Sequence, residues 1–153
     1  MRNLLKTIFL LALLTSSGAS LCADRGTAEE AVATVQKTVG SMKANGPVKT
    51  IAEINKLNPQ FRDRDLYISI MDMKGFLVAH GENKRMQGID IVDLKDVDGK
   101  FYIRERLAML KVKDSGWQDY KFVNPVTKQI EQKSMYFQKY GDWVISCGVY
   151  KPI

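Results

Sequence analysis

Apolar positions between residues 27 and 45 follow the period of an α-helix. Thr27 and Glu30 form a capping box, in which each side chain satisfies a backbone N–H at the helix start. Gly46 and Pro47 end the helix, because Gly can adopt a left-handed cap and Pro cannot continue the hydrogen bonding. The polar face lacks dense Lys and Arg, so we predict a helix packed on a sheet rather than on a membrane surface. The apolar stripe consists of Ala28, Ala31, Val32, Val35, Val39 and Met42.

Two shorter helices are predicted by the same spacing. Pro47 suits the first position of a helix over residues 47–57. Its apolar face is Val48, Ile51, Ile54 and Leu57. Residues 101–112 form the other helix, with a buried side expected to be Ile103, Leu107 and Leu110. The opposite side carries Tyr102, Arg106 and Met109.

The remaining apolar runs alternate with period two and predict strands. Residues 66–71 and 76–80 read as a hairpin, and residues 116–122, 132–140 and 143–150 as a three-stranded meander. This order of helices and strands predicts an α+β domain with an antiparallel sheet. The long loop over residues 81–100 is of a length that often carries function.

The strand at residues 66–71 has two different faces. Leu66, Ile68 and Ile70 form an aliphatic face, which suits packing in a core. The other face consists of Tyr67, Ser69 and Met71. A sheet face of this mixed composition is typical of a pocket with a few polar groups.

Residues 1–23 have the pattern of a secretory signal peptide. Arg2 and Lys6 form a basic head, a short apolar run follows, and Ala23 precedes the expected cleavage site. A lipoprotein at Cys22 is the alternative, but Leu21 stands where a lipobox needs Gly or Ala. We therefore expect a periplasmic or secreted domain over residues 24–153. Because the chain ends at Ile153 without an output module, we expect a free binding protein rather than a complete receptor.

Charge and catalytic motifs narrow the classes of function. The net charge of +6 is modest and the basic residues are scattered, which argues against a nucleic-acid partner. His80 is the single histidine, so a histidine metal cluster is excluded. Asp93, Asp96 and Asp98 lack the spacing of an EF-hand and are read as turn residues. Cys147 with His80 is a weak candidate nucleophile pair, and a buried structural Cys is favoured. We predict no enzyme, no metal site and no cofactor.

Lys133 is the most informative polar residue of the meander. A lysine in mid-strand beside aromatic residues either guards a sheet edge against aggregation or faces a pocket, and its own pattern leaves both open.

Five blocks of sequence resemble the single Cache domain (Cache type 2) family. They are residues 65–72 (DLYISIMD), 75–81 (GFLVAHG), 88–105 (GIDIVDLKDVDGKFYIRE), 116–136 and 141–152. The resemblance implies an extracytoplasmic sensor of small molecules, with a PAS-like five- to six-stranded antiparallel sheet. A long N-terminal helix would lie on one face and a ligand pocket on the other. It also implies an organic acid as ligand and basic groups that hold its carboxylate.

Carried onto this chain, the resemblance gives eight candidate ligand-binding residues. They are Tyr67, His80, Tyr102, Arg104, Trp117, Tyr120, Lys133 and Tyr136. Met135 stands where relatives often have a small hydroxyl residue, which implies a smaller or more apolar pocket. Lys133 and Tyr136 have opposite parity, so without a bulge they cannot both face the ligand.

The expected partners are a small carboxylate, a membrane receptor or transporter that receives the ligand, and a second copy of the chain in a homodimer. The alternative is a structural or protein-interaction module that keeps the Cache fold and binds no ligand. An enzyme that uses Cys147 is the third alternative.

Overall fold

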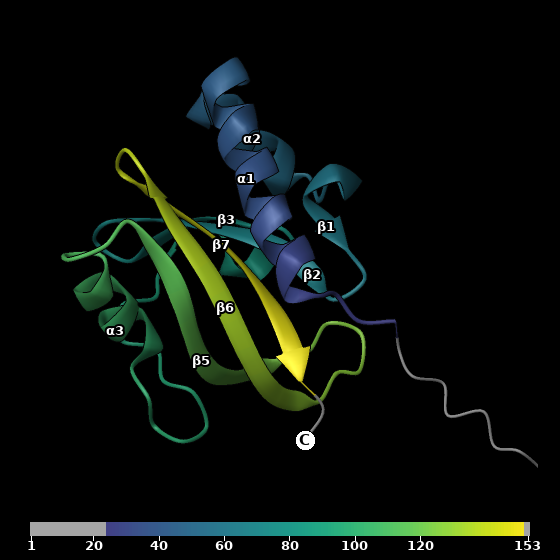
Figure 1. The fold of residues 1–153 in the computed structure, drawn as a ribbon, viewed down its shortest axis with the longest axis vertical. Helices are drawn as coiled ribbons and strands as arrows, with labels where there is room; N and C mark the ends of the chain where they lie inside the picture. The colour runs from purple at the N-terminus through teal and green to yellow at the C-terminus, as the bar shows by residue number, and fades with distance from the viewer. Residues whose placement is uncertain (1–23, 152–153) are drawn as a thin grey trace, which may run out of the picture.

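The computed structural model describes residues 24–151, which form a central sheet with helices on both faces (Figure 1). The sheet order is β4-β3-β2-β7-β6-β5, and β1 pairs with β2 beside this path. All of these pairings are antiparallel. The strands are β1 (Arg62–Asp63), β2 (Leu66–Asp72), β3 (Phe76–His80), β4 (Ile89–Asp90), β5 (Ser115–Val123), β6 (Ile130–Tyr140) and β7 (Trp143–Lys151). The expected α+β class is confirmed.

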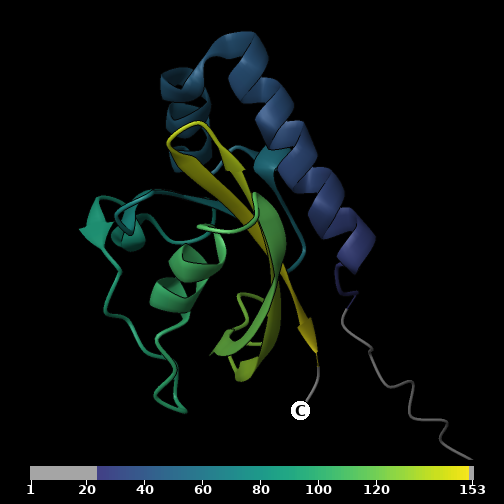
Figure 2. The same ribbon diagram turned by 60° about the vertical axis from the view of Figure 1, so that its left-hand side comes forward.

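Helix α1 (Ala28–Asn45) lies along one face of the sheet, and α3 (Tyr102–Met109) lies on the opposite side (Figure 2). Helix α2 (Pro47–Asn55) packs beside α1. Both halves of the capping box predicted at Thr27 and Glu30 are present. The N-terminal helix therefore occupies one face and leaves the other for α3 and the loops around it.

The core between α1 and the sheet is aliphatic. Ala31, Val35 and Val39 of α1 are buried with Ile68 and Ile70 of β2 and with residues of β7. The predicted core face of residues 66–71 is therefore confirmed. Cys147 belongs to the same cluster, and burial raises the pKa of its thiol to about 12. The thiol therefore stays protonated at neutral pH. Because the thiolate is the reactive form, Cys147 has the properties of a structural cysteine.

The predicted long loop contains more structure than expected. A 3-10 turn η2 (Lys84–Met86) and the short strand β4 lie within it, and Asp96 organises its last part. The Asp96 carboxylate accepts hydrogen bonds from the backbone N–H groups of Asp98, Lys100 and Lys121. Asp96 is therefore a turn residue that also ties the loop to β5.

Two helix predictions need correction. Val48 was expected on the apolar face of α2, but it is 84% exposed because it lies in the first turn, away from the sheet. Helix α3 is shorter than residues 101–112, and its buried residues are Tyr102, Ile103 and Arg106. Ile103 and Leu110 are buried as predicted, and the Tyr102–Arg106 side also faces the protein interior.

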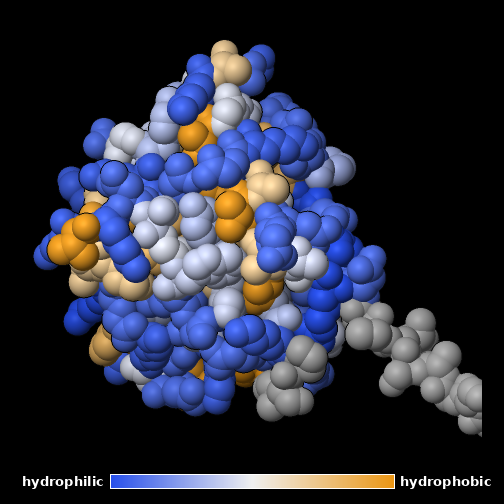
Figure 3. Space-filling model, in the orientation of Figure 1, coloured by the Kyte–Doolittle hydropathy of each residue, from blue (hydrophilic) through white to orange (hydrophobic). Residues whose placement is uncertain are grey.

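The molecular surface is mostly hydrophilic on the face drawn in Figure 3, with apolar residues in small separate patches. No helix within residues 24–151 is long and apolar enough to cross a membrane. The predicted signal peptide, residues 1–23, lies outside the described residues.

Candidate functional site

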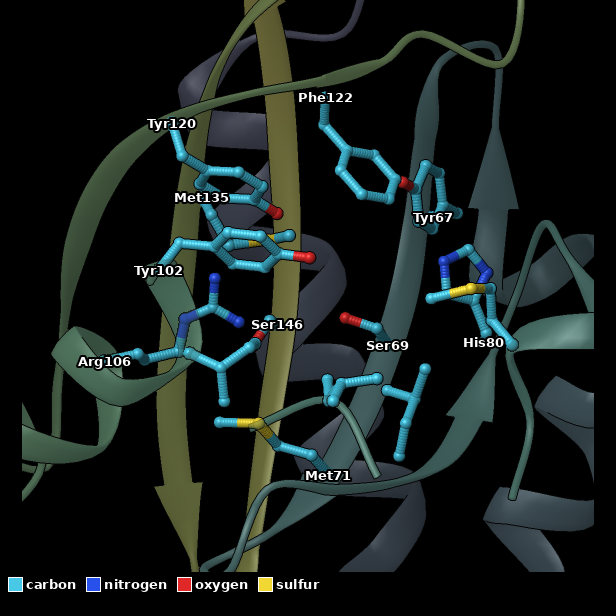
Figure 4. Close-up of a pocket in the computed structure, with 14 residues that line it drawn as sticks. Tyr67, Ser69, Met71, His80, Tyr102, Arg106, Tyr120, Phe122, Met135 and Ser146 are labelled. Carbon is cyan, nitrogen blue, oxygen red and sulfur yellow. The ribbon is translucent and has the colours of Figure 1, made fainter. Parts of the chain in front are cut away.

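A small cavity lies between α3 and the sheet face that α1 leaves uncovered (Figure 4). Its volume is about 30 Å³. The lining side chains come from β2, β3, β5, β6, β7, α3 and the long loop. They are Tyr67, Ser69, Met71, Leu77, His80, Met86, Ile91, Tyr102, Ile103, Arg106, Tyr120, Phe122, Met135 and Ser146.

A second hollow of about 370 Å³ adjoins this cavity. The two share the side chains of Tyr67, His80, Met86 and Phe122. These four residues therefore form the boundary between an inner cavity and an outer vestibule. Lys128 and Pro125 line the outer part of the vestibule.

The mixed face of β2 forms one wall of the cavity, as its sequence pattern predicted. Tyr67, Ser69 and Met71 all line it. Ser146 of β7 is the cross-strand neighbour of Ser69. The two serines therefore lie next to each other in the sheet, and both side chains line the cavity (Figure 4).

His80 presents a neutral ring to the cavity. Its Nδ1 accepts hydrogen bonds from the backbone N–H groups of Glu82 and Asn83, at 3.3 and 3.0 Å. The proton of the neutral ring therefore lies on Nε2. Burial, together with the charge of Lys133, lowers the pKa of His80 to about 3. His80 is thus an uncharged donor at neutral pH.

Two stacked tyrosines form the wall beside α3. The ring centroids of Tyr102 and Tyr120 are 4.3 Å apart and the ring planes differ by 6°. Burial raises the pKa of both phenols. Their hydroxyls therefore stay protonated, and Figure 4 shows both directed toward the middle of the cavity.

Arg106 brings a buried positive charge to the cavity and was missed as a candidate residue. It is 3% exposed, and its Nε donates to Gln118 Oε1 at 3.2 Å. Among the described residues, its Nη2 is buried without a hydrogen-bond partner. An unpaired buried guanidinium nitrogen is costly unless a ligand completes it. Arg106 lies one helical turn after Tyr102, and this spacing is the signal that could have identified it.

Lys133 is fully buried in the middle of the sheet. Its Nζ donates to the hydroxyls of Tyr67 and Tyr150, at 2.7 and 2.9 Å. It also lies 4.0 and 4.4 Å from the centroids of these two rings. Burial lowers the pKa of Lys133 to about 7. Because β6 lies between β5 and β7, Lys133 does not guard a sheet edge.

The hydroxyl network around Lys133 directs one proton toward the cavity. The protonated lysine only donates, so both tyrosine oxygens accept from it. Tyr150 donates its own proton to the Val123 carbonyl at 2.9 Å. The Tyr67 hydroxyl lies 3.1 Å from that of Tyr150 and also lines the cavity. Tyr67 can therefore donate to a bound acceptor while Lys133 polarises it.

The structure brings five of the eight predicted residues together at this site. Tyr67, His80, Tyr102 and Tyr120 line the cavity, and Lys133 supports it through Tyr67.

Arg104, Trp117 and Tyr136 lie elsewhere, and their placement corrects the prediction. Arg104 is two residues from Tyr102 on α3, so its side chain points away from the cavity. It is exposed and pairs with Asp93. Trp117 and Tyr136 lie on the α1 face, with ring centroids 5.3 Å apart. Trp117 is three positions from Tyr120 and Tyr136 is three positions from Lys133, and an odd offset along a strand directs the side chain to the other face.

The candidate nucleophile pair of Cys147 and His80 is also separated. Cys147 is in the core beneath α1, whereas His80 lines the cavity on the other side of the sheet. Met135 does line the cavity, in agreement with the expectation of an apolar pocket.

Comparisons with known proteins agree with this architecture. The chain matches the single Cache domain 2 family over residues 21–152. It is 29% identical over 90 residues to the methyl-accepting chemotaxis protein McpP of Pseudomonas putida. That match covers 58% of this chain and 16% of the relative, so the chain spans only a small part of that relative's length.

Solved structures of sensor domains share the fold. One is a Cache chemosensory domain studied for carboxylic acid recognition, with a TM-score of 0.68 and 24% identity, covering 81% of this chain and 92% of that one. A methyl-accepting chemotaxis protein from Vibrio parahaemolyticus also has a TM-score of 0.68 and 24% identity, over 80% of this chain and 86% of that one. These relatives are chemoreceptor sensor domains rather than enzymes. Sequence match and architecture together show that the chain belongs to the single Cache domain 2 family.

Proposed function

We propose that this chain is an extracytoplasmic domain that binds a small carboxylate in the cavity beneath α3 and does not convert it. The observation that carries the proposal is the charge of the site. Arg106 lines the cavity and Lys133 lies one tyrosine away, and none of the described lining residues is acidic. Two buried cations without a carboxylate side chain between them favour an anionic ligand.

The arrangement of donors suits a carboxylate group. Arg106 has a buried nitrogen to donate, and charge-assisted bonds from a guanidinium to a carboxylate are among the stronger ones. Tyr67 and His80 offer neutral donors on the opposite wall (Figure 4). A short acid between them would exchange its hydration shell for fixed donors.

The cavity volume favours a very short acid. A space of about 30 Å³ corresponds to roughly two water positions, at about 10–15 Å³ each. Met71, Ile91 and Met135 provide the apolar surface for a short alkyl group. We therefore propose a monocarboxylate of two or three carbons as the ligand, with longer acids admitted only if the Met86–Phe122 boundary opens.

The relatives support the biological setting. One structural neighbour is a carboxylic acid-recognising chemosensory domain, and another is a periplasmic sensor domain of a chemotaxis protein. We propose by analogy that this domain acts in the periplasm or is secreted. Its role would be sensing, or presentation of the ligand to a membrane receptor or transporter. A homodimer is part of the same proposal.

Thermal unfolding of residues 24–153 with and without acetate or propionate tests the proposal. A bound acid raises the melting temperature through its preference for the folded state. Acetamide and propionamide, which have the same size and no charge, should give no shift. Arg106→Gln should remove the acid-dependent shift, whereas Arg104→Gln, on the exposed side of the same helix, should retain it.

Two results would contradict the proposal. One is the absence of a shift with any short acid at millimolar concentration. The other is an equal loss of the shift in both arginine variants. The first result would favour the alternative of an interaction module with the same fold and no ligand. The unliganded melting temperature of each variant verifies that it folds.

A further inference from the structure

Lys133 is a buried cation without an acidic partner. Its polar contacts are the Tyr67 and Tyr150 hydroxyls, and the Phe122 ring lies 5.5 Å from its Nζ. Within residues 24–151 no carboxylate forms an ion pair with it. A buried ammonium surrounded by aromatic rings is tolerated through cation–π contacts, but its charge is not neutralised.

The neighbouring strand is shaped around this lysine. A Cβ on Gly148 of β7 would lie 2.4 Å from Lys133 Cε, so only glycine leaves room for the side chain. The lysine is therefore a built feature of the site rather than a surface residue that folds inward. Its Nζ is one hydroxyl group away from the cavity, because Tyr67 both accepts from Lys133 and lines the cavity.

The charged and titratable groups around Lys133 come from every element packed against it. Asp65 and the Cys147 thiol favour the protonated lysine, whereas burial and the charge of Arg106 oppose it. Burial is the largest of these influences. The remaining neighbours are Tyr67 on β2, His80 on β3, Tyr120 on β5, Glu131 on β6 and Tyr150 on β7.

We propose that binding of a carboxylate in the cavity is coupled to the uptake of one proton by Lys133, so that this site responds to pH as well as to its ligand. The inference rests on the proposed function and adds regulation to it. The proton comes from solvent, and Lys133 holds it while the anion occupies the cavity. Tyr67 transmits the interaction between the two.

The direction of the coupling follows from the charges. Without a ligand, Lys133 has a pKa of about 7 and is mostly neutral above that pH. An anion next to Tyr67 favours the ammonium form and raises the pKa of Lys133. Between these two pKa values, the ligand affinity falls about tenfold for each unit of rising pH. Below about pH 6 the lysine is already charged, and the affinity becomes independent of pH.

The other buried groups near the cavity do not titrate in this range. His80 has a pKa of about 3 and Cys147 of about 12. Burial raises the pKa values of Tyr67, Tyr102, Tyr120 and Tyr150 above the usual phenol value. Lys133 is therefore the group near the cavity to which a proton-linked change between pH 7 and 9 would be assigned.

Isothermal titration of sodium acetate into the chain at pH 8 tests the coupling. The same titration is run in phosphate and in Tris, which release different heats on protonation. We expect the difference in binding heat to correspond to the uptake of nearly one proton at pH 8 and of almost none at pH 6. The dissociation constant should weaken about tenfold between pH 7.5 and 8.5.

Lys133→Met tests whether Lys133 is the group that takes up the proton, since methionine has a similar length and no charge. This variant should show no proton uptake, whereas Lys111→Met, an exposed lysine just after α3, should behave like the unmodified chain. If Lys133→Met does not fold, the NMR shift of the Lys133 Cε in the unmodified chain serves instead. It should titrate near pH 7 without acetate and at higher pH with it.

Acetate binding with equal heats in both buffers and a constant affinity from pH 6 to 9 would overturn the coupling but leave the proposed function intact. Proton uptake that persists in Lys133→Met, or a Lys133 resonance that acetate leaves unmoved, would overturn the assignment. No binding of acetate at any pH, with no binding of propionate either, would remove both the coupling and the function on which it rests.

Discussion

Gly148 has no side chain, and Lys133 occupies the space where one would lie. The closest approach is to Lys133 Cε, at 2.4 Å from an ideal Cβ, and the backbone oxygen of Ser134 follows at 3.1 Å. A single missing methyl group on β7 thus fixes the position of the charge on β6.

Gly148→Ala should therefore lower the free energy of unfolding by about 1–3 kcal/mol, because overpacking forces a buried side chain or strand to shift. Urea unfolding measures this change. Gly40→Ala is the matched control: Gly40 lies in α1 with no atom within 4 Å of its Cβ position, so alanine should stabilise the chain by up to about 1 kcal/mol. Equal effects of the two changes would contradict this account.

Arg106 shows where residue patterns reach their limit. A charged residue in a short helix is typical of a solvated face, so the pattern favoured Ile103, Leu107 and Leu110 as the buried side of α3. In the structure Tyr102 and Arg106 also point inward, because both side chains line the cavity between α3 and the sheet. Local hydrophobicity cannot distinguish this case from a surface helix.

At the scale of elements, the pleat was the most reliable guide. Alternation along β2 separated the core face from the cavity face, and the parity argument correctly placed Lys133 and Tyr136 on opposite sides of β6. The role of Lys133 depended instead on the strand order. Only the position of β6 between β5 and β7 removes the edge-guard alternative, and no local pattern contains that order.

The outer edge of β5 is protected by the end of the long loop. Asp96 accepts a hydrogen bond from the Lys121 N–H at 3.1 Å, and Lys100 Nζ donates to the Asp119 carbonyl at 2.6 Å. Both backbone groups belong to an edge strand, where unpaired groups invite pairing with another chain. The loop therefore binds backbone groups in the middle of this edge strand, at residues 119 and 121.

Asp96→Ala should weaken this cover. Loss of three hydrogen bonds to a carboxylate is expected to lower the unfolding free energy by about 2 kcal/mol and to expose the edge of β5. Light scattering at increasing concentration should then detect more self-association than in the unmodified chain. Asp93→Ala, which removes only an exposed pair with Arg104, is the control. An Asp96→Ala chain with unchanged stability and scattering would show that the loop does not protect the edge.

At the scale of the whole molecule, the segment before α1 contacts the start of β6 and the residue just before β2. Arg25 pairs with Glu131 at the start of β6, and the Gly26 N–H donates to the Asp65 carboxylate. Glu131 also accepts from Asn124 at 2.9 Å and from Thr127 at 2.7 Å. This buried carboxylate therefore joins the first described residues to the β5–β6 connection, a contact between residues 106 positions apart.

Glu131 should make the stability of the whole domain sensitive to acid. The hydrogen bond from Arg25 is the largest influence that lowers its pKa, to about 2, from the usual 4.5. Since the folded-state pKa is depressed, its stabilising contribution is complete above about pH 4.5 and is lost as the pH falls toward 2. The urea midpoint of Glu131→Gln should fall less between pH 5 and pH 3 than the midpoint of the unmodified chain. Arg25→Met should also reduce the acid-induced loss, because the folded-state pKa of Glu131 then lies closer to its unfolded value. Parallel pH profiles for all three chains would mean that this contact does not hold the N-terminal segment to the sheet.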